Sequence, residues 1–188
     1  MWSKSGKVAA ANGSVMRTSI TGVFDFPHLD RVHRNTRLMA LVTHADPRCM
    51  ASCILVATAL SGVLQGAAVT TDAEVEAFLE QCVAVTLREV PLGAHEETFV
   101  AHARMKKLEE MKLDEPAAIG YTLKCMASGL YGLRSNEPFE VALTRLVREA
   151  GDADTNGSCT GSLLGAKVGY DGLPADWLKA LPNKPWSV

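Results

Sequence analysis

The sequence lacks the features that mark several protein classes. Only 6% of its residues are aromatic and 21% are charged, with a net charge of −2 at neutral pH. A small negative net charge provides no broad basic surface, so nucleic-acid binding is not indicated. The hydrophobic fraction of 47% excludes a disordered chain. The 188 residues are enough for one domain with a real core, which we expect to span residues 1–188.

The cysteines are too few and too widely spaced for a disulfide framework. There are five, an odd number, whereas a disulfide framework needs pairs at regular spacing. Two of them, Cys49 and Cys53, would share a helix face, but no histidine stands at ligand spacing beside them, so a zinc site is not expected. We expect reduced, buried thiols. The five are Cys49, Cys53, Cys82, Cys125 and Cys159.

Signals for secretion and for membrane insertion are also weak. Residues 1–7 contain no apolar run of the kind found in a secretory signal, so we expect a cytoplasmic protein, with a nuclear location left open. Residues 49–69 are uncharged and long enough to span a membrane. They nevertheless include several polar side chains, and Asp46-Pro47-Arg48 stands at their start. We therefore expect a buried core helix and no membrane association.

Strand signals are scarce, and helical spacing recurs along the chain. Asp46-Pro47 is typical of an N-cap followed by proline in the first turn, and Thr71 with Glu74 forms a capping-box pattern. These signals predict an all-α fold of roughly eight or nine helices. The expected segments are 28–42, 49–69, 72–87, 120–133, 138–150, one that follows Asn156, a short one from Leu173-Pro174, and a solvated helix face over 96–112.

What the sequence does contain is an acidic turn, Gly151-Asp152-Ala153-Asp154-Thr155-Asn156-Gly157. Two carboxylates separated by one residue project to the same side if the backbone between them is extended. A hydroxyl follows directly. Hard oxygen ligands of this kind suit Mg²⁺ or Ca²⁺, so the turn predicts a site for a divalent cation.

Two other interpretations of the acidic turn were open. Its spacing also matches the start of an EF-hand calcium loop. That loop needs a bidentate glutamate at its twelfth position, which here is Leu163, so the calcium loop is excluded. The second alternative is structural: aspartate and asparagine favour helix N-caps, and these residues would then only begin the next helix. The turn alone does not exclude that alternative.

Three further motifs accompany the acidic turn in a fixed order, and together they extend over about residues 8–178. They are Asn12-Gly-Ser-Val-Met-Arg17, Thr43-His-Ala-Asp-Pro-Arg48 and Gly120-Tyr-Thr-Leu-Lys-Cys-Met-Ala-Ser-Gly-Leu130, and the acidic turn is itself followed by Gly161-Ser-Leu-Leu-Gly-Ala166. This series resembles the signature of the ADP-ribosylglycohydrolases, the family of the dinitrogenase reductase-activating glycohydrolase.

The resemblance implies a compact orthogonal helical bundle, all α, with a pair of Mg²⁺ ions in a central cleft. It implies hydrolysis of the glycosidic bond that joins ADP-ribose to a protein or small-molecule acceptor. By motif match, Asp152, Asp154 and Thr155 are the expected metal ligands. Both aspartates would act in catalysis through a metal-bound water. The expected ADP-ribose-binding residues are Asn12, Gly13, Ser14, Met16 and His44.

Each of the binding residues also has a structural interpretation. His44 could cap the helix that follows it, and Asn12-Gly13 alone is an ordinary turn. Arg17 is interpreted as a structural ion-pair partner and stays outside the expected site.

The sequence departs from the family at its start. The family carries a Thr-Asp-Asp metal motif and a further acidic residue ahead of the Asn-Gly-Ser element, and neither occurs here. We therefore expect a fragment that lacks the N-terminal helices, with an incomplete metal site and impaired hydrolysis. Two alternatives stand beside the hydrolase: a non-catalytic ADP-ribose-binding module, and a helical structural protein whose resemblance is accidental.

Overall fold

The computed structural model describes Gly6 and residues 9–182. The ends of the predicted domain 1–188 lie outside the described residues, and so does the segment 1–7, apart from Gly6. The described part contains ten α-helices, short 3-10 helices and no strand, which confirms the all-α fold class. The α-helices are α1 (Gly13–Thr18), α2 (Leu29–Leu41), α3 (Pro47–Leu64), α4 (Asp72–Glu89), α5 (Glu96–Ala103), α6 (Leu108–Met111), α7 (Thr122–Arg134), α8 (Phe139–Arg148), α9 (Ala153–Val168) and α10 (Ala175–Ala180), and the 3-10 helices are η2 (Ser19–Gly22), η3 (Gly93–His95), η4 (Pro116–Ala118) and η5 (Tyr170–Gly172).

Two helix starts that capping chemistry predicts are confirmed. The Thr71 hydroxyl accepts a hydrogen bond from the Glu74 backbone N–H at 3.3 Å, and the Glu74 carboxylate accepts one from the Thr71 N–H at 2.9 Å. This capping box begins α4. At the start of α3, Asp46 Oδ1 accepts from the Arg48 N–H at 2.9 Å, and Pro47 occupies the first turn. Both caps satisfy N–H groups that a helix start leaves without partners.

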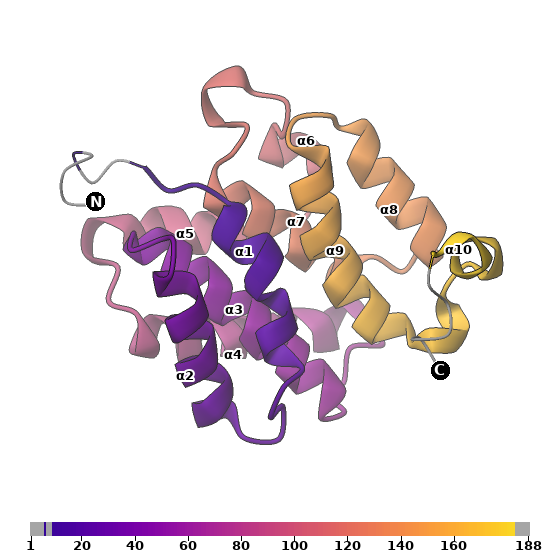
Figure 1. Ribbon diagram of the computed structural model, residues 1–188, viewed down its shortest axis with the longest axis horizontal. Coiled ribbons are helices and arrows are strands. Elements are labelled where there is room, and N and C mark those ends of the chain that lie inside the picture. The colour runs from indigo at the N-terminus through magenta and orange to yellow at the C-terminus, as the bar shows by residue number, and fades with distance from the viewer. Residues whose placement is uncertain (1–5, 7–8, 183–188) are drawn as a thin grey trace.

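Helix α3 forms the centre of the bundle (Figure 1). It is the one helix in the described part of the chain that is long and apolar enough to cross a membrane, and 72% of that apolar window is buried inside the protein. Helices α1, α2, α4, α7 and α9 all pack against it. The predicted core helix is confirmed, although it ends at Leu64, because Gly66 adopts a left-handed φ of 88° just beyond it.

Helices α7 and α9 cross at unusually short range. A methyl group added at Gly129 would lie 2.6 Å from Cys159 Sγ, and one added at Gly132 would lie 2.9 Å from the Thr160 carbonyl oxygen. The Thr160 hydroxyl donates across the same contact to the Ser128 carbonyl at 2.8 Å. The two backbones can approach this closely because neither glycine carries a side chain. All five cysteines are free and buried, as expected.

Two expected segments differ from the structure. Helix α9 begins at Ala153, ahead of Asn156, so the second aspartate of the acidic turn and the threonine after it lie inside its first turn. The expected solvated face over 96–112 breaks into α5 and α6. The charged side chains of this segment, such as Glu97 and Glu109, are exposed as expected, while the apolar side chains Phe99, Leu108 and Met111 are buried.

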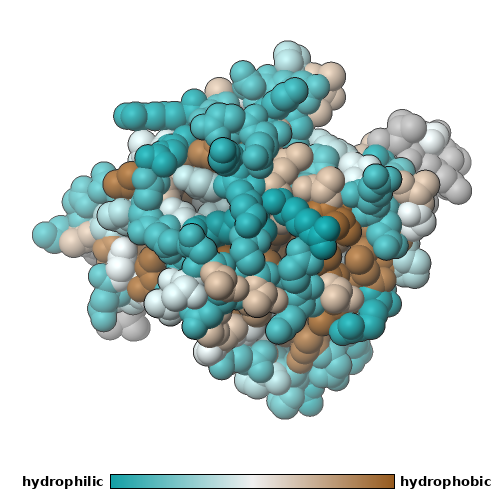
Figure 2. Space-filling view, turned by 180° about the vertical axis from the view of Figure 1, so that it is seen from behind, coloured by the Kyte–Doolittle hydropathy of each residue, from teal (hydrophilic) through white to brown (hydrophobic). Residues whose placement is uncertain are grey.

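The surface is not uniformly polar. Seen from behind, it is mostly hydrophilic, with hydrophobic side chains gathered toward the right of the view (Figure 2). On the opposite face α1 lies at the front (Figure 1), and α1, η2 and the residues just after them expose a row of apolar side chains. The row consists of Met16, Ile20, Val23 and Phe24.

The α7–α9 crossing predicts a contrast between two glycines. Gly132→Ala should lower the free energy of unfolding by about 1–3 kcal/mol, the usual cost of overpacking, because its methyl group would meet backbone 2.9 Å away. Gly161→Ala, on α9, has its nearest neighbours at 4.0 Å. It should be neutral or stabilise by up to about 1 kcal/mol through helix propensity. Urea unfolding measures both, and equal effects would contradict the close crossing.

Candidate functional site

The turn before α9 fixes where the acidic residues lie. Ala150 and Gly151 both adopt left-handed backbone, with φ of 58° and 67°. A methyl group added at Gly151 would collide with the Leu113 carbonyl oxygen, so this position accepts only glycine. After this reversal Asp152 is the N-cap of α9, and Asp154 lies in its first turn.

The acidic turn gathers oxygen atoms at the N-terminus of α9. Asp154 Oδ1 accepts from the Thr155 backbone N–H at 2.8 Å, and this hydrogen bond holds the pKa of Asp154 below its ordinary value. Thr155 is 5% exposed, and its hydroxyl donates to Met16 Sδ at 3.5 Å. The condition under which both carboxylates project to the same side, an extended backbone between them, is not met, because Ala153 is already helical.

Asn12 joins the acidic turn to the N-terminal motif. Its Nδ2 donates to Asp152 Oδ2 at 2.7 Å, across 140 residues of sequence. The Asn12 N–H donates to the Gly120 carbonyl at 2.9 Å, and the Thr122 N–H donates to the Ala10 carbonyl at 2.9 Å. These bonds tie the segment before α1 to the start of α7. The expected binding motif and the expected metal motif therefore lie together where α1 and α9 run side by side (Figure 1).

His44 also lies against the start of α1. A methyl group added at Gly13 would be 3.6 Å from His44 Cε1, so the ring rests against the Gly13 backbone. His44 Nδ1 is 2.7 Å from the Thr43 hydroxyl. Burial, and then the charge of Arg17, lower the pKa of His44. The alternative in which His44 caps α3 is excluded, because Asp46 is the N-cap.

Ser14 and Met16, also expected to bind ADP-ribose, face different surroundings. Ser14 is fully buried, and its hydroxyl has no hydrogen-bond partner among the described residues. It lies against the thiols of Cys49 and Cys53. Its side chain therefore faces the core. Met16 is 39% exposed and contacts Thr155.

Sequence reasoning missed two features around His44. Arg17 donates to the Met39 carbonyl at 2.8 Å and to the Thr43 hydroxyl at 2.5 Å. Arg48 pairs with the buried Asp46 carboxylate at 2.8 Å, which raises the pKa of Arg48, and its guanidinium lies 5.8 Å from the centre of the Tyr121 ring. The signal for the pair was present in the spacing of Asp46 and Arg48 around a proline. Nothing in the sequence linked Arg17 to a partner more than 20 residues away.

A hollow of about 420 Å³ opens beside Asn12. The hollow is shallow and open to solvent. Its walls are mostly methyl groups and backbone, so it offers shape and apolar contact with few charges. The lining residues are Ala9, Ala10, Ala11, Ala117, Ala118, Gly120 and Tyr121.

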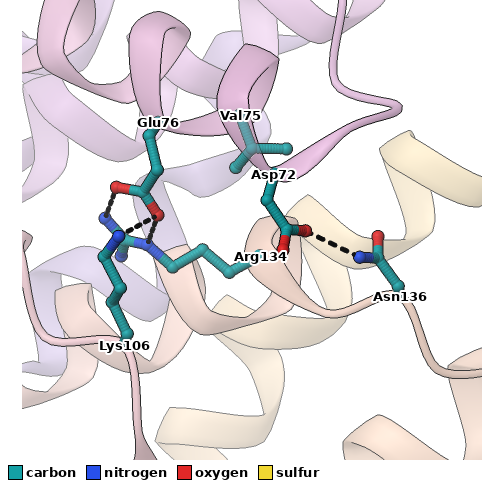
Figure 3. A pocket seen from close by; sticks show the side chains of 6 residues that line it. All are labelled: Asp72, Val75, Glu76, Lys106, Arg134 and Asn136. Carbon is teal, nitrogen blue, oxygen red and sulfur yellow. Dashed lines mark hydrogen bonds and ion pairs between the residues drawn. The ribbon is translucent and has the colours of Figure 1, made fainter.

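A second hollow lies between α4 and α7, where polar side chains join the two helices (Figure 3). Arg134 Nε binds Glu76 Oε1 at 2.8 Å, and Lys106 lies 3.4 Å from the same carboxylate. Asn136 donates to Asp72 at 2.8 Å. The hydrogen bond from Arg134 lowers the pKa of Glu76. Because the charged side chains that line this hollow pair with one another, they are not available to a ligand.

The donor chemistry of the acidic turn fits part of a magnesium shell. Asp152, Asp154 and Thr155 offer carboxylate and hydroxyl oxygen, the donors that Mg²⁺ prefers, and Mg²⁺ often uses only one or two carboxylates plus water. Within residues 9–182, no group of three or more His, Cys, Asp or Glu side chains is placed to hold a metal ion. If Mg²⁺ binds at the turn, these three residues would supply only part of its coordination shell.

Comparison with known proteins gives a family and several relatives. The sequence model of the family ADP-ribosylglycohydrolase matches residues 1–187. ADP-ribosylarginine hydrolase Tri1 of Serratia proteamaculans is 24% identical over 172 residues, which are 92% of this chain and 43% of that protein. Its namesake in Pseudomonas putida is 25% identical over 170 residues, 90% of this chain and 42% of that protein. The ADP-ribosyl-dinitrogen reductase glycohydrolase of Rhodospirillum rubrum is 36% identical over 64 residues, 34% of this chain and 22% of that protein. The chain thus spans less than half the length of these relatives.

The Asn12–Asp152 hydrogen bond predicts a stability difference between two asparagines. Asn12→Ala should lower the free energy of unfolding by about 1.5–3 kcal/mol, the range for a hydrogen bond to a charged group, because Asn12 is 6% exposed. Asn136→Ala removes the same kind of bond, to Asp72, at an exposed position. It should cost no more than about 0.5 kcal/mol. Thermal and urea unfolding compare the two, and equal losses would contradict a buried link between α1 and α9.

Proposed function

This chain belongs to the ADP-ribosylglycohydrolase family, and from that premise we propose that it serves in magnesium-dependent hydrolysis of the glycosidic bond of ADP-ribosylated substrates. The observation that carries the proposal is the 2.7 Å hydrogen bond from Asn12 to Asp152. It brings the residues expected to bind ADP-ribose into contact with those expected to hold the metal.

The residues around this bond have separate roles in the proposed reaction. The Asn12 side-chain amide donates a hydrogen bond to Asp152 and so fixes the orientation of that carboxylate. Its own backbone is anchored to α7, so it forms a rigid boundary between ligand and metal. His44 faces the same α1 start. A ribose bound at this start would have its hydroxyls near the acidic turn.

Asp152, Asp154 and Thr155 would hold Mg²⁺. When bound there, the ion supplies positive charge next to the ribose and Lewis acidity for the attack of water on the anomeric carbon. Asp154 is exposed and its carboxyl is ionised at neutral pH, because the Thr155 N–H lowers its pKa. Carboxylates beside the sugar also stabilise the positive charge that develops on it in glycoside hydrolysis.

The remainder of ADP-ribose has a candidate location. The hollow lined by Ala9–Ala11 and Tyr121 opens beside Asn12, and its apolar walls suit the flat face of a nucleobase. As substrate class we propose ADP-ribosylated arginine on a protein, since relatives that align with about nine tenths of this chain are named ADP-ribosylarginine hydrolases.

A non-catalytic ADP-ribose-binding module is the second candidate. It is favoured by one observation: within the described residues no cluster of three or more His, Cys, Asp and Glu side chains is placed around a metal position. Binding needs the Asn12 and His44 side of the site, whereas hydrolysis also needs a completed metal shell.

Calorimetry with ADP-ribose, in the presence and absence of Mg²⁺, tests the proposal. The chain should bind ADP-ribose, and Mg²⁺ should strengthen binding. At a ligand concentration of about 100 times Kd, the free energy of unfolding should rise by about 2.7 kcal/mol. Asp154→Ala should remove the effect of Mg²⁺, whereas Asp171→Ala, also an exposed aspartate, should leave it unchanged.

Release of ADP-ribose from an arginine-ADP-ribosylated protein separates the two candidates. Mg²⁺-dependent release that Asp154→Ala abolishes supports the hydrolase. Binding without release supports the binding module. A folded sample that binds no ADP-ribose under either condition contradicts both, and release that Asp154→Ala leaves intact contradicts the assigned metal ligands.

A further inference from the structure

Arg17 connects three parts of the chain that meet beside the site. From α1, its Nη2 donates to the Met39 carbonyl at 2.8 Å and to the Thr43 hydroxyl at 2.5 Å. Met39 lies in the last turn of α2, which ends at Leu41. Carbonyls in a final turn lack helical partners and attract cations. Arg17 thus holds the end of α2 and the turn after it against α1.

The bond to Thr43 fixes the direction of the next hydrogen bond. A guanidinium can only donate, so the Thr43 oxygen accepts from Arg17, and its own proton remains to be donated. The neighbouring His44 Nδ1 lies 2.7 Å from that hydroxyl. In this arrangement each group is used once: Arg17 donates to Thr43, and Thr43 donates to His44 Nδ1. In the opposite arrangement the two lone pairs of the Thr43 oxygen would accept from His44 and from Arg17, and the Thr43 proton would have no partner among these three groups.

If Nδ1 of His44 accepts a hydrogen bond, the protonation state of the other ring nitrogen follows. Because burial and the nearby charge of Arg17 lower the pKa of His44, the ring is neutral at physiological pH and carries one proton. With Nδ1 accepting, that proton is on Nε2. A methyl group added at Gly13 would lie 3.8 Å from Nε2 and 3.6 Å from Cε1, so this edge of the ring borders the start of α1.

We propose that Arg17 and Thr43 are positioning residues that hold His44 as its Nε2–H tautomer, so that the ring presents a single hydrogen-bond donor at the Gly13 edge of the site. The ligand group that meets this edge is then an acceptor oxygen, of a phosphate or a ribose, and a purely donating group such as an ammonium is rejected. This assignment of ligand chemistry rests on the proposed function. The tautomer itself does not.

A purely structural role for Arg17 makes a different prediction. If Arg17 only closed the end of α2 through Met39, Thr43 could lose its hydroxyl without consequence for the ring. Thr43→Val is nearly isosteric, removes the hydroxyl and leaves the bond from Arg17 to Met39 in place. Thr43 is exposed, so the substitution does not disturb the core. Thr43→Ser retains the hydroxyl and is the matched control.

Long-range ¹H–¹⁵N correlation spectroscopy of the 188-residue chain measures directly which ring nitrogen of His44 is protonated. His44→Gln identifies its signals, and the other four histidines, His28, His33, His95 and His102, serve as internal references. The native chain should show a protonated Nε2 and an unprotonated, hydrogen-bonded Nδ1. In Thr43→Val the two ¹⁵N shifts should move toward each other as the tautomers mix, and Thr43→Ser should keep the native pattern.

Arg17→Met provides a second, independent variant. It removes the donor and the charge, so tautomers should again mix and the pKa of His44 should rise toward its ordinary value. A protonated Nδ1 in the native chain, or an unchanged nitrogen pattern in both Thr43→Val and Arg17→Met, overturns the proposal. These shifts are read without ligand. A native tautomer together with no ADP-ribose binding would therefore contradict the proposed function and leave the positioning role standing.

Discussion

The close crossing of α7 and α9 is the constraint on which the site depends. Gly129 and Gly132 let the backbone of α9 approach to a distance that no side chain would allow. The axis of α9 is thereby fixed relative to α7, and so is the direction in which its N-terminus points. At Gly151 the chain reverses direction against the Leu113 carbonyl. This reversal places Asp152 at the start of α9. The acidic residues are placed by packing at Cys159 and Thr160, about two turns along α9.

Helix α1 is short but is held at both ends by other parts of the bundle. Before it, backbone hydrogen bonds join Ala10 and Asn12 to the start of α7, and the Asn12 side chain reaches Asp152 on α9. At its last turn, Arg17 reaches the end of α2. An isolated helix of this length would not be stable. These tertiary contacts stabilise α1, and they therefore also fix the positions of the site residues on it.

Much of the helical framework could be predicted from the sequence because its signals are local. The Thr71–Glu74 capping box and the Asp46-Pro47 start act within a few residues, and both helix starts were found. The start of α9 was placed too late, because Asp152 makes no side-chain capping bond and Asn156 is an equally plausible cap by type. Four ordered motifs predicted Asn12, His44 and the acidic turn as site residues, and the structure brings Asn12 into contact with Asp152. The pairing of Arg17 with Thr43 depends on how α1 and α2 pack, and no local pattern encodes it.

Electrostatics explains why metal and ligand would depend on each other in the proposed function. The acidic turn carries two carboxylates, and the diphosphate of ADP-ribose is also negative. Two like charges about 6 Å apart repel by about 3 kcal/mol at an effective dielectric constant of about 20. A neutral His44 offers a hydrogen bond but no compensating charge. A divalent cation between carboxylates and ligand would therefore strengthen binding in addition to its part in the chemistry. The three oxygen donors of the turn fill only part of a magnesium shell, so the remaining ligands must come from water, from the substrate, or from polypeptide outside the described residues.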